Sequence, residues 1–254
     1  MTESWQRKLD RADEHLKALD KALNRFVNRR PYKVAIENVT PGREAILRAR
    51  IVSEPPPELA VLLGDALFNL RSGLDHIAWS LAKPTPAQED RVEFPIFGPG
   101  KASEYSAAID RKLPGVVDAA RKEIEAMQPF NGKHPEWHPL WRLYLLSNTD
   151  RHRLLHVTGA TSQYAELHIS NVRDLEVTMR ETQPVGSFED GAVLARVHTT
   201  QTGPNPEMQM NLRTLWAVAF GPDTPAPNMI VSLLMWAIRD YVYDVAIKRL
   251  TPFL

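Results

Sequence analysis

The sequence predicts an α+β protein: a helical bundle core with an N-terminal β-hairpin and an antiparallel sheet of about four strands. Apolar residues recur at helical spacing over the N-terminal half and near the C-terminal end. Between about residues 162 and 220 apolar residues alternate with polar ones, which is typical of strands with one solvent-exposed face. Runs of helices and runs of strands, rather than their alternation, indicate the α+β class.

The first half of the chain divides at prolines. A helix is predicted over residues 3–30, and Pro31 ends it. A hairpin is predicted over residues 32–53, with its turn at Pro41-Gly42. A long helix follows over residues 57–82, and residues 84–100 read as a loop.

The second half carries shorter elements and a final helix. Helices are predicted over residues 102–111, 115–128, 139–156 and 228–250, and strands over residues 163–170, 173–181, 191–199 and 207–219. We expect one domain, 1–254, with a helical part (1–156 plus 228–254) and a β-rich part (157–227).

Composition excludes several classes of function. The chain has 254 residues, equal numbers of basic and acidic residues (31 each) and no Cys, so disulfides, Cys-ligated zinc and a catalytic thiol are excluded. A net charge of zero gives no overall attraction to nucleic acid or to an anionic membrane. The longest apolar run is about half of what a membrane span needs. We expect a soluble cytoplasmic protein without a cofactor or membrane partner.

The helix at 57–82 has two unlike sides. One side is an apolar seam of residues spaced alternately four and three apart: Leu63, Leu67, Leu70, Leu74, Ile77 and Leu81. The other side carries short polar residues and a histidine: Asp65, Asn69, Ser72 and His76. Arg71 and Asp75, spaced i, i+4, lie on the adjoining flank. This polar side has two interpretations. It is either a functional site, in which Arg71 donates hydrogen bonds to an anion and His76 titrates near neutral pH, or a structural network around a buried Arg71–Asp75 ion pair.

A second polar cluster lies in the segment LSNTDRHRLLH. Its ionisable and amide residues are Asn148, Asp150, Arg151, His152, Arg153 and His156. If the segment is helical, Asn148 and His152 share a face, and Asp150 points away. If a new turn begins there, Asn148 or Thr149 serves instead as a helix N-cap. The site interpretation and the structural interpretation stay open for this cluster.

Histidines spaced four apart do not complete a metal motif. His134 and His138 form one such pair, and His152 and His156 form another. Prolines place the first pair in a loop, and no third ligand follows in a known zinc pattern. We therefore expect no metal site.

Three motifs together resemble a widespread family of bacterial proteins for which we know no established activity. They are GDALFNLRSGLDH (Gly64–His76), FPI (Phe94–Ile96) and LSNTDRHR (Leu146–Arg153). The resemblance covers roughly residues 32–156 in the same order. It implies membership and no particular function.

The spacing from Arg71 to His76 is also distantly similar to the R-x4-H pattern of the HEPN superfamily of helical, often dimeric ribonucleases. The resemblance implies metal-independent cleavage of RNA. Arg71 would then bind the scissile phosphate, and His76 would assist the attack of the 2′-oxygen or protonate the leaving group. Two copies facing each other would complete one site.

Three functions are compatible with these patterns. The first, which we favour, is a non-catalytic binding or scaffold protein with buried polar networks. The second is a HEPN-like ribonuclease with Arg71, Asp75 and His76 as catalytic residues, RNA as partner and a homodimer as its form. The third is a metal-dependent hydrolase that uses Asp65, Asp75, His76, Asp150 and His152. The candidate binding residues of the two polar clusters are Asp65, Asn69, Asn148, Asp150, Arg151, His152 and Arg153.

Overall fold

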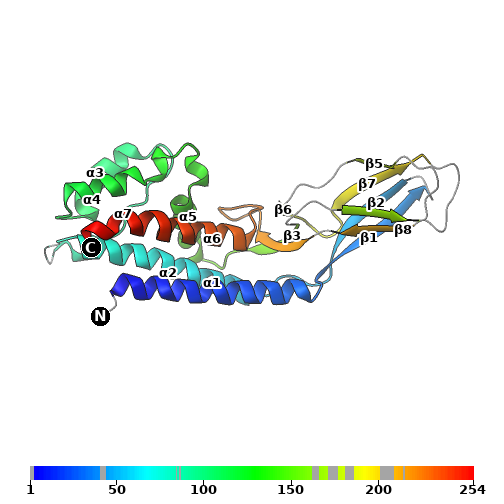
Figure 1. Cartoon of the computed structure of the whole chain (residues 1–254), viewed down its shortest axis with the longest axis horizontal. Helices are drawn as coiled ribbons and strands as arrows, with labels where there is room; N and C mark the ends of the chain where they lie inside the picture. The colour runs from blue at the N-terminus through cyan, green and yellow to red at the C-terminus, as the bar shows by residue number, and fades with distance from the viewer. Residues whose placement is uncertain are drawn as a thin grey trace.

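The computed structural model confirms the α+β class and most of the predicted helices (Figure 1). It describes residues 3–40, 44–83, 85, 87–161, 166–170, 177–180, 186–200, 209–213 and 215–254. The predicted turn at Pro41-Gly42 therefore lies outside the described residues. The main helices are α1 (Ser4–Asn28), α2 (Glu58–Leu81), α3 (Ala102–Lys112), α4 (Asp118–Ala126), α5 (Pro139–Asp150), α6 (Val231–Tyr241) and α7 (Lys248–Leu250).

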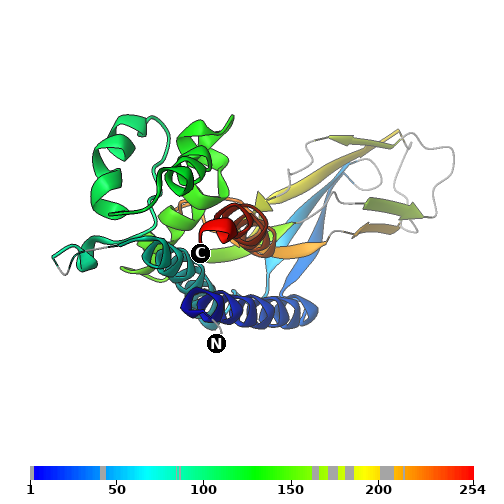
Figure 2. The ribbon, with the colours of Figure 1, turned by 60° about the vertical axis from the view of Figure 1, so that its left-hand side comes forward.

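The helices form because apolar residues line one face of each and bury it. In α1 the buried positions repeat at helical spacing: Leu9, Ala12, Leu16, Leu19, Leu23 and Phe26. The seam predicted for α2 is confirmed, since every one of its six residues is buried. In Figures 1 and 2 the C-terminal helix lies between α1 and the α3–α4 pair. Within the described residues, no helix combines the length and apolarity that crossing a membrane requires.

Among the described residues the strands pair antiparallel, and they form three sheets rather than a hairpin beside one separate sheet. Their bounds are β1 (Tyr32–Thr40), β2 (Glu44–Ile51), β3 (Val157–Thr161), β4 (Glu166–Ser170), β5 (Val177–Arg180), β6 (Gly186–Ser187), β7 (Val193–Thr199), β8 (Gln209–Arg213) and β9 (Trp216–Phe220). The orders are β1-β2-β7-β5, β6-β3-β9 and β4-β8. The N-terminal hairpin thus pairs with later strands, with Leu47 of β2 opposite Ala195 of β7. Alternation predicts strands but not their neighbours, because any strand with a matching face can pair.

Three boundaries differ from the predictions. The helix predicted over 139–156 ends at Asp150, because the chain turns so that Leu155 enters the core and the His156 carbonyl accepts the Gly221 N–H at 2.9 Å. The strand predicted over 207–219 is two strands in different sheets, β8 and β9, and β3 was not predicted. The last helix begins at Val231 and includes a π-helical segment, Val242–Ile247.

An aromatic cluster joins the helical part to the strands. Tyr32, at the start of β1, packs its ring 5.8 Å from Phe26 of α1, 5.4 Å from Phe188 and 5.6 Å from Trp216 of β9 (centroid distances). The four-stranded sheet lies beyond this cluster, at the opposite end of the molecule from α3 and α4 (Figure 1). Both polar clusters of the sequence belong to the helical end.

Candidate functional site

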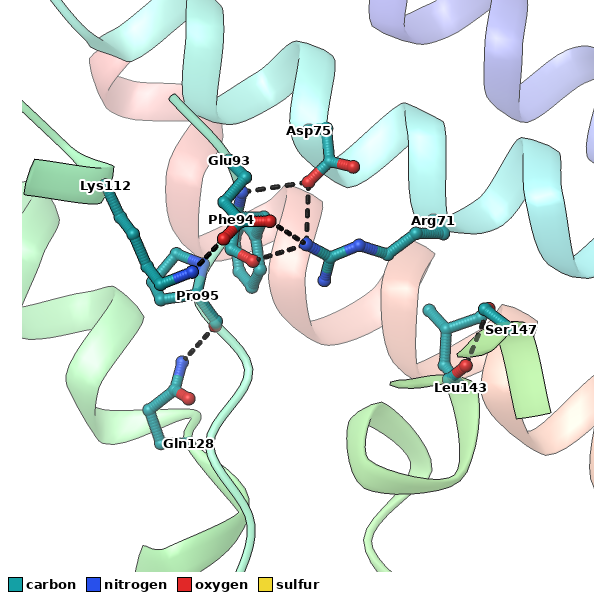
Figure 3. Close-up of polar contacts among 9 residues, drawn as sticks. All are labelled: Arg71, Asp75, Glu93, Phe94, Pro95, Lys112, Gln128, Leu143 and Ser147. Carbon is teal, nitrogen blue, oxygen red and sulfur yellow. Dashed lines mark hydrogen bonds and ion pairs between the residues drawn. The ribbon is translucent and has the colours of Figure 1, made fainter. Parts of the chain in front are cut away.

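Arg71 anchors a polar network on α2 (Figure 3). Its side chain is 9% exposed, and its Nη2 lies 2.9 Å from Asp75 Oδ1, so the predicted i, i+4 ion pair is present. Nη2 also donates to the Phe94 carbonyl at 2.8 Å, and the Phe94 N–H donates to Asp75 Oδ1 at 2.9 Å. The pair therefore holds the backbone of the FPI segment against α2.

The network continues from this loop to α3 and α4. Arg71 Nη2 lies 3.7 Å from Glu93 Oε2, and the other oxygen of Glu93 accepts a hydrogen bond from Lys112 at the end of α3. On the other side of the loop, the buried amide of Gln128 donates to the Pro95 carbonyl (Figure 3). The same amide accepts the Phe97 N–H through its oxygen. Residues 93–97 are thus fixed by side chains from three sides. Sequence reasoning missed Glu93, Lys112 and Gln128, because nothing local to them indicates these contacts.

A cleft of about 780 Å³ opens beside this network. Its floor is Arg71 with the 93–98 loop, and its two walls are α3 and α5. It is lined by Arg71, Glu93, Phe94, Ile96, Phe97, Gly98, Lys101, Glu104, Ala107, Ala108, Arg111, Lys112, Trp141, Tyr144, Asn148 and Arg151. The cleft brings together Arg71 of the first polar cluster with Asn148 and Arg151 of the second.

Positive charge converges on the floor of the cleft. Burial, followed by the charge of Arg151, lowers the pKa of Arg71, although Asp75 opposes the shift. Burial, followed by the charge of Arg71, likewise lowers the pKa of Lys112. The positive charges of Arg71, Lys112 and Arg151 repel one another in a partly desolvated space. An anion bound among them would relieve this repulsion.

One donor of Arg71 has no partner. Its Nη1 is buried and makes no hydrogen bond with any described residue, while Nη2 is shared among Asp75, Phe94 and Glu93. Figure 3 shows Nη1 pointing away from Asp75. Buried polar groups in proteins are almost always hydrogen-bonded, so this donor calls for an acceptor that none of the described residues provides.

His76 lies outside this cleft. Its Nδ1 is 3.0 Å from Ser4 Oγ at the start of α1, and His76 is not among the lining residues. Five residues of α-helix rotate by about 140° net, so Arg71 and His76 leave α2 in different directions. The structure therefore keeps Arg71 and Asp75 together and separates His76 from them within one chain.

The remaining polar residues of α2 face α1 and the end of α5. Asn69 donates to the Asp65 carbonyl at 2.8 Å, and the Asp65 carboxylate lies 3.8 Å from His15 Nδ1. Gly64 lets α5 approach closely, since a Cβ there would lie 2.5 Å from an Asp150 carboxylate oxygen. Burial and the neighbouring Asp65 raise the pKa of Asp150. The first motif of the sequence thus meets the third here, at a contact distinct from the cleft.

The remaining residues of the second cluster lie outside the cleft. Arg153 donates to the Asp223 carbonyl at 3.0 Å, and His156 Nδ1 lies 2.7 Å from Asp223 Oδ1. His152 is exposed in the turn that follows α5. Within the described part of the chain, no group of three or more His, Asp or Glu residues is arranged to hold a metal ion.

His138 has a structural role at the start of α5. Its Nδ1 accepts the Leu140 N–H at 3.3 Å as an N-cap, and its ring packs edge-on against Tyr241 at 4.7 Å. Burial lowers the pKa of His138 from 6.5 to about 4. A protonated ring would also lose the acceptor that caps the helix.

We expect His138 to make the fold less stable in mild acid. Between pH 6.5 and 4 the unfolded chain binds a proton at this residue that the folded chain does not. Stability is therefore lost as the pH falls through this window, by about 2–3 kcal/mol at pH 4.5. Urea unfolding at pH 7 and 4.5 measures the loss. His138→Asn keeps a capping acceptor but cannot titrate, so its free energy of unfolding should fall less between pH 7 and 4.5. An equal fall in both proteins would contradict the assignment of the acid sensitivity to His138.

The fold and cleft define an α+β protein with a basic cleft between helices. Comparison with protein-family models, with curated proteins and with solved structures found no significant match. The residues of the cleft are therefore the basis for the function proposed below.

Proposed function

We propose that this protein is a non-catalytic binding protein whose α2–α3–α5 cleft takes an anionic ligand. The observation that carries the proposal is the buried Nη1 of Arg71, which has no partner among the described residues. Arg71 lines the cleft, and its Nη1 lacks an acceptor among the described residues while Nη2 is held by Asp75. A phosphate or carboxylate oxygen that binds beside the guanidinium would supply that acceptor.

The charge balance supports a doubly charged ligand. The lining residues include five cations, namely Arg71, Lys101, Arg111, Lys112 and Arg151. Against them stand Glu93 and Glu104 in the lining, together with Asp75 behind Arg71. The excess of two positive charges matches a phosphate monoester, which carries about −1.5 to −2 at neutral pH, better than a single carboxylate.

Two of these cations are available to a ligand. Arg111 and Arg151 make no ion pair with any residue that the structure describes, whereas Lys101 pairs with Glu104 and Lys112 pairs with Glu93. Arg111 stands on α3 and Arg151 at the end of α5, so they face the cleft from opposite walls. Such an arrangement surrounds an anion that rests on the floor.

The lining favours binding over catalysis. Among the described residues that line the cleft, none is His, Ser, Thr or Asp, and both glutamates are paired with lysines. Acid–base and nucleophilic catalysis also use Glu, Lys and Tyr, but here the two glutamates and two lysines pair with each other, which leaves Tyr144 as the group of this kind in the described lining that forms no ion pair. The cleft gives no support to the ribonuclease hypothesis, because His76 contacts Ser4 and is not among the described lining residues. RNA binding, a homodimer and metal-dependent hydrolysis stay predictions from the sequence.

Arg151→Ala is the substitution that tests anion binding. Calorimetric titration with inorganic phosphate and pyrophosphate should show binding to the unaltered protein and about ten-fold weaker binding to the variant, because a charge-assisted hydrogen bond is lost. Arg151 is exposed and unpaired among the described residues, so the fold should be retained.

The matched control is Arg153→Ala, which removes an exposed arginine two residues away that interacts with Asp223 instead of the cleft. It should bind both anions as the unaltered protein does. Absence of binding to either anion, or equal affinities for Arg151→Ala and the unaltered protein, would overturn the proposed function.

A further inference from the structure

One face of α5 forms a complete wall of the cleft. Its lining residues are Trp141, Tyr144, Asn148 and Arg151, spaced three, four and three apart, so they lie within about 80° on the helix. The face is aromatic at its first turn and cationic at its last. At 1.5 Å per residue, Tyr144 and Arg151 stand about 10 Å apart along the axis. The wall therefore offers two chemically different subsites in one line.

The aromatic subsite is a flat, preformed platform. The rings of Trp141 and Tyr144 are stacked, with centroids 5.2 Å apart and an interplanar angle of 10°. The loop backbone fixes Trp141, since a Cβ on Gly98 would lie 2.6 Å from the Trp141 ring. Both aromatic residues are half-buried and line the cleft. A planar ring of a ligand bound in the cleft would extend this stack.

The cationic subsite lies at the other end of the wall. Arg151 lines the cleft together with Arg71 and Lys112, and the Nη1 of Arg71 is buried without a hydrogen-bond partner among the described residues. Asn148, one helical turn before Arg151, adds an amide that both donates and accepts between the two subsites. A ligand that uses both ends must join a dianionic group to a planar ring.

We infer that the ligand is a free nucleoside monophosphate or a compound of the same chemistry, a phosphate monoester joined through a short polar spacer to a planar aromatic ring. The inference rests on the proposed function and adds the ring to it. The phosphate lies against Arg71, Lys112 and Arg151, and the ring stacks beside Tyr144.

Two observations favour a free ligand over a nucleic-acid strand. The cleft volume, about 780 Å³, falls within the range of small-molecule sites. The whole chain has a net charge of zero, whereas binding along a nucleic-acid backbone depends on neutralising many phosphates. The excess positive charge of the cleft is sufficient for one phosphate monoester.

The test compares probes that contain one or both parts of the ligand. The probes are the four common nucleoside 5′-monophosphates, the corresponding nucleosides, ribose 5-phosphate and a 5′-phosphorylated oligonucleotide, each titrated by calorimetry. We expect at least one nucleoside monophosphate to bind about ten-fold or more tightly than ribose 5-phosphate, because ring stacking is added to the same phosphate contacts. The nucleosides should bind weakly.

The two subsites are separated by substitutions at each end. Tyr144→Leu should abolish the advantage of the nucleotide, measured as the ratio of its affinity to that of ribose 5-phosphate in the same variant. Tyr144→Phe keeps the ring and removes the hydroxyl, which interacts with Arg71, so it should retain the advantage. Arg151→Ala should weaken both ligands by a similar factor, and Arg153→Ala should change neither. If Tyr144→Leu does not fold, the comparison of nucleotides with ribose 5-phosphate on the unaltered protein still decides the question.

The outcomes distinguish this inference from the proposed function. Equal affinity for ribose 5-phosphate and every nucleotide, with Tyr144→Leu neutral, overturns the inference and leaves anion binding in place. Failure of all phosphorylated probes and of the inorganic anions overturns the proposed function. An oligonucleotide that binds more than ten-fold tighter than any mononucleotide overturns the assignment to a free ligand.

Discussion

Replacing Asp75 with alanine is expected to reduce the free energy of unfolding by about 3–5 kcal/mol. The substitution removes the ion pair at 2.9 Å from Arg71 and leaves a guanidinium that is 9% exposed without its nearest counter-charge. It also removes the acceptor of the Phe94 N–H. Denaturant unfolding monitored by tryptophan fluorescence measures the loss.

Controls separate this effect from a simple loss of charge. Glu14→Ala breaks the exposed pair with Arg11 on α1 and should shift the unfolding midpoint little. The double variant Arg71→Met/Asp75→Leu should recover much of the stability, because apolar residues of similar size replace buried ion pairs at little cost. A small effect of Asp75→Ala would show that Glu93 and water compensate, and the network would then not be what fixes the FPI loop.

Gly73→Val is expected to destabilise the fold by about 2–3 kcal/mol, the range for overpacking a core. A Cβ at this position would lie 2.5 Å from Leu9 Cδ2 and 2.8 Å from Leu9 Cγ, and Leu9 is fully buried between the helices. Because the Leu9 side chain has no free space to move into, α1 and α2 must separate. Urea unfolding of the variant measures the change.

The partner residue provides the decisive control for Gly73. Leu9→Ala alone should be destabilising, because it leaves a cavity. Combined with Gly73→Val it should be less destabilising than the sum of the two single variants, since the valine fills the space that Leu9 vacates. Additive effects would show that Gly73 does not determine the approach of α1 to α2.

Stability and anion binding depend largely on different residues. Asp75 and Gly73 are tested by unfolding, whereas Arg151 and Tyr144 stand on α5 and are tested by binding. Arg71 belongs to both functions, because one of its nitrogens holds the loop and the other is without a partner. Variants of Arg71 would therefore change stability and binding together and are less informative than those of Arg151.

Local patterns in the sequence were sufficient to predict the helices and one ion pair. The apolar seam of α2 and the Arg71–Asp75 pair follow from helical spacing, since residues three and four apart lie on the same face whatever surrounds the helix. The hairpin of β1 and β2 likewise follows from alternation and a turn between adjacent segments. The end of α5 did not follow, because distant contacts of Leu155 and His156 determine it.

The sequence by itself thus determined the α+β class, the positions of most helices and the presence of two polar clusters. Only the tertiary structure decided that Arg71 meets Arg151 and Lys112, that His76 turns to Ser4 instead, and that the hairpin extends a sheet with β7. The physical reason is the range of the interactions. Periodicity constrains residues within one element, whereas the partners of Arg71 outside α2 are separated from it by 20 to 80 positions and depend on how α3 and α5 pack around the FPI loop.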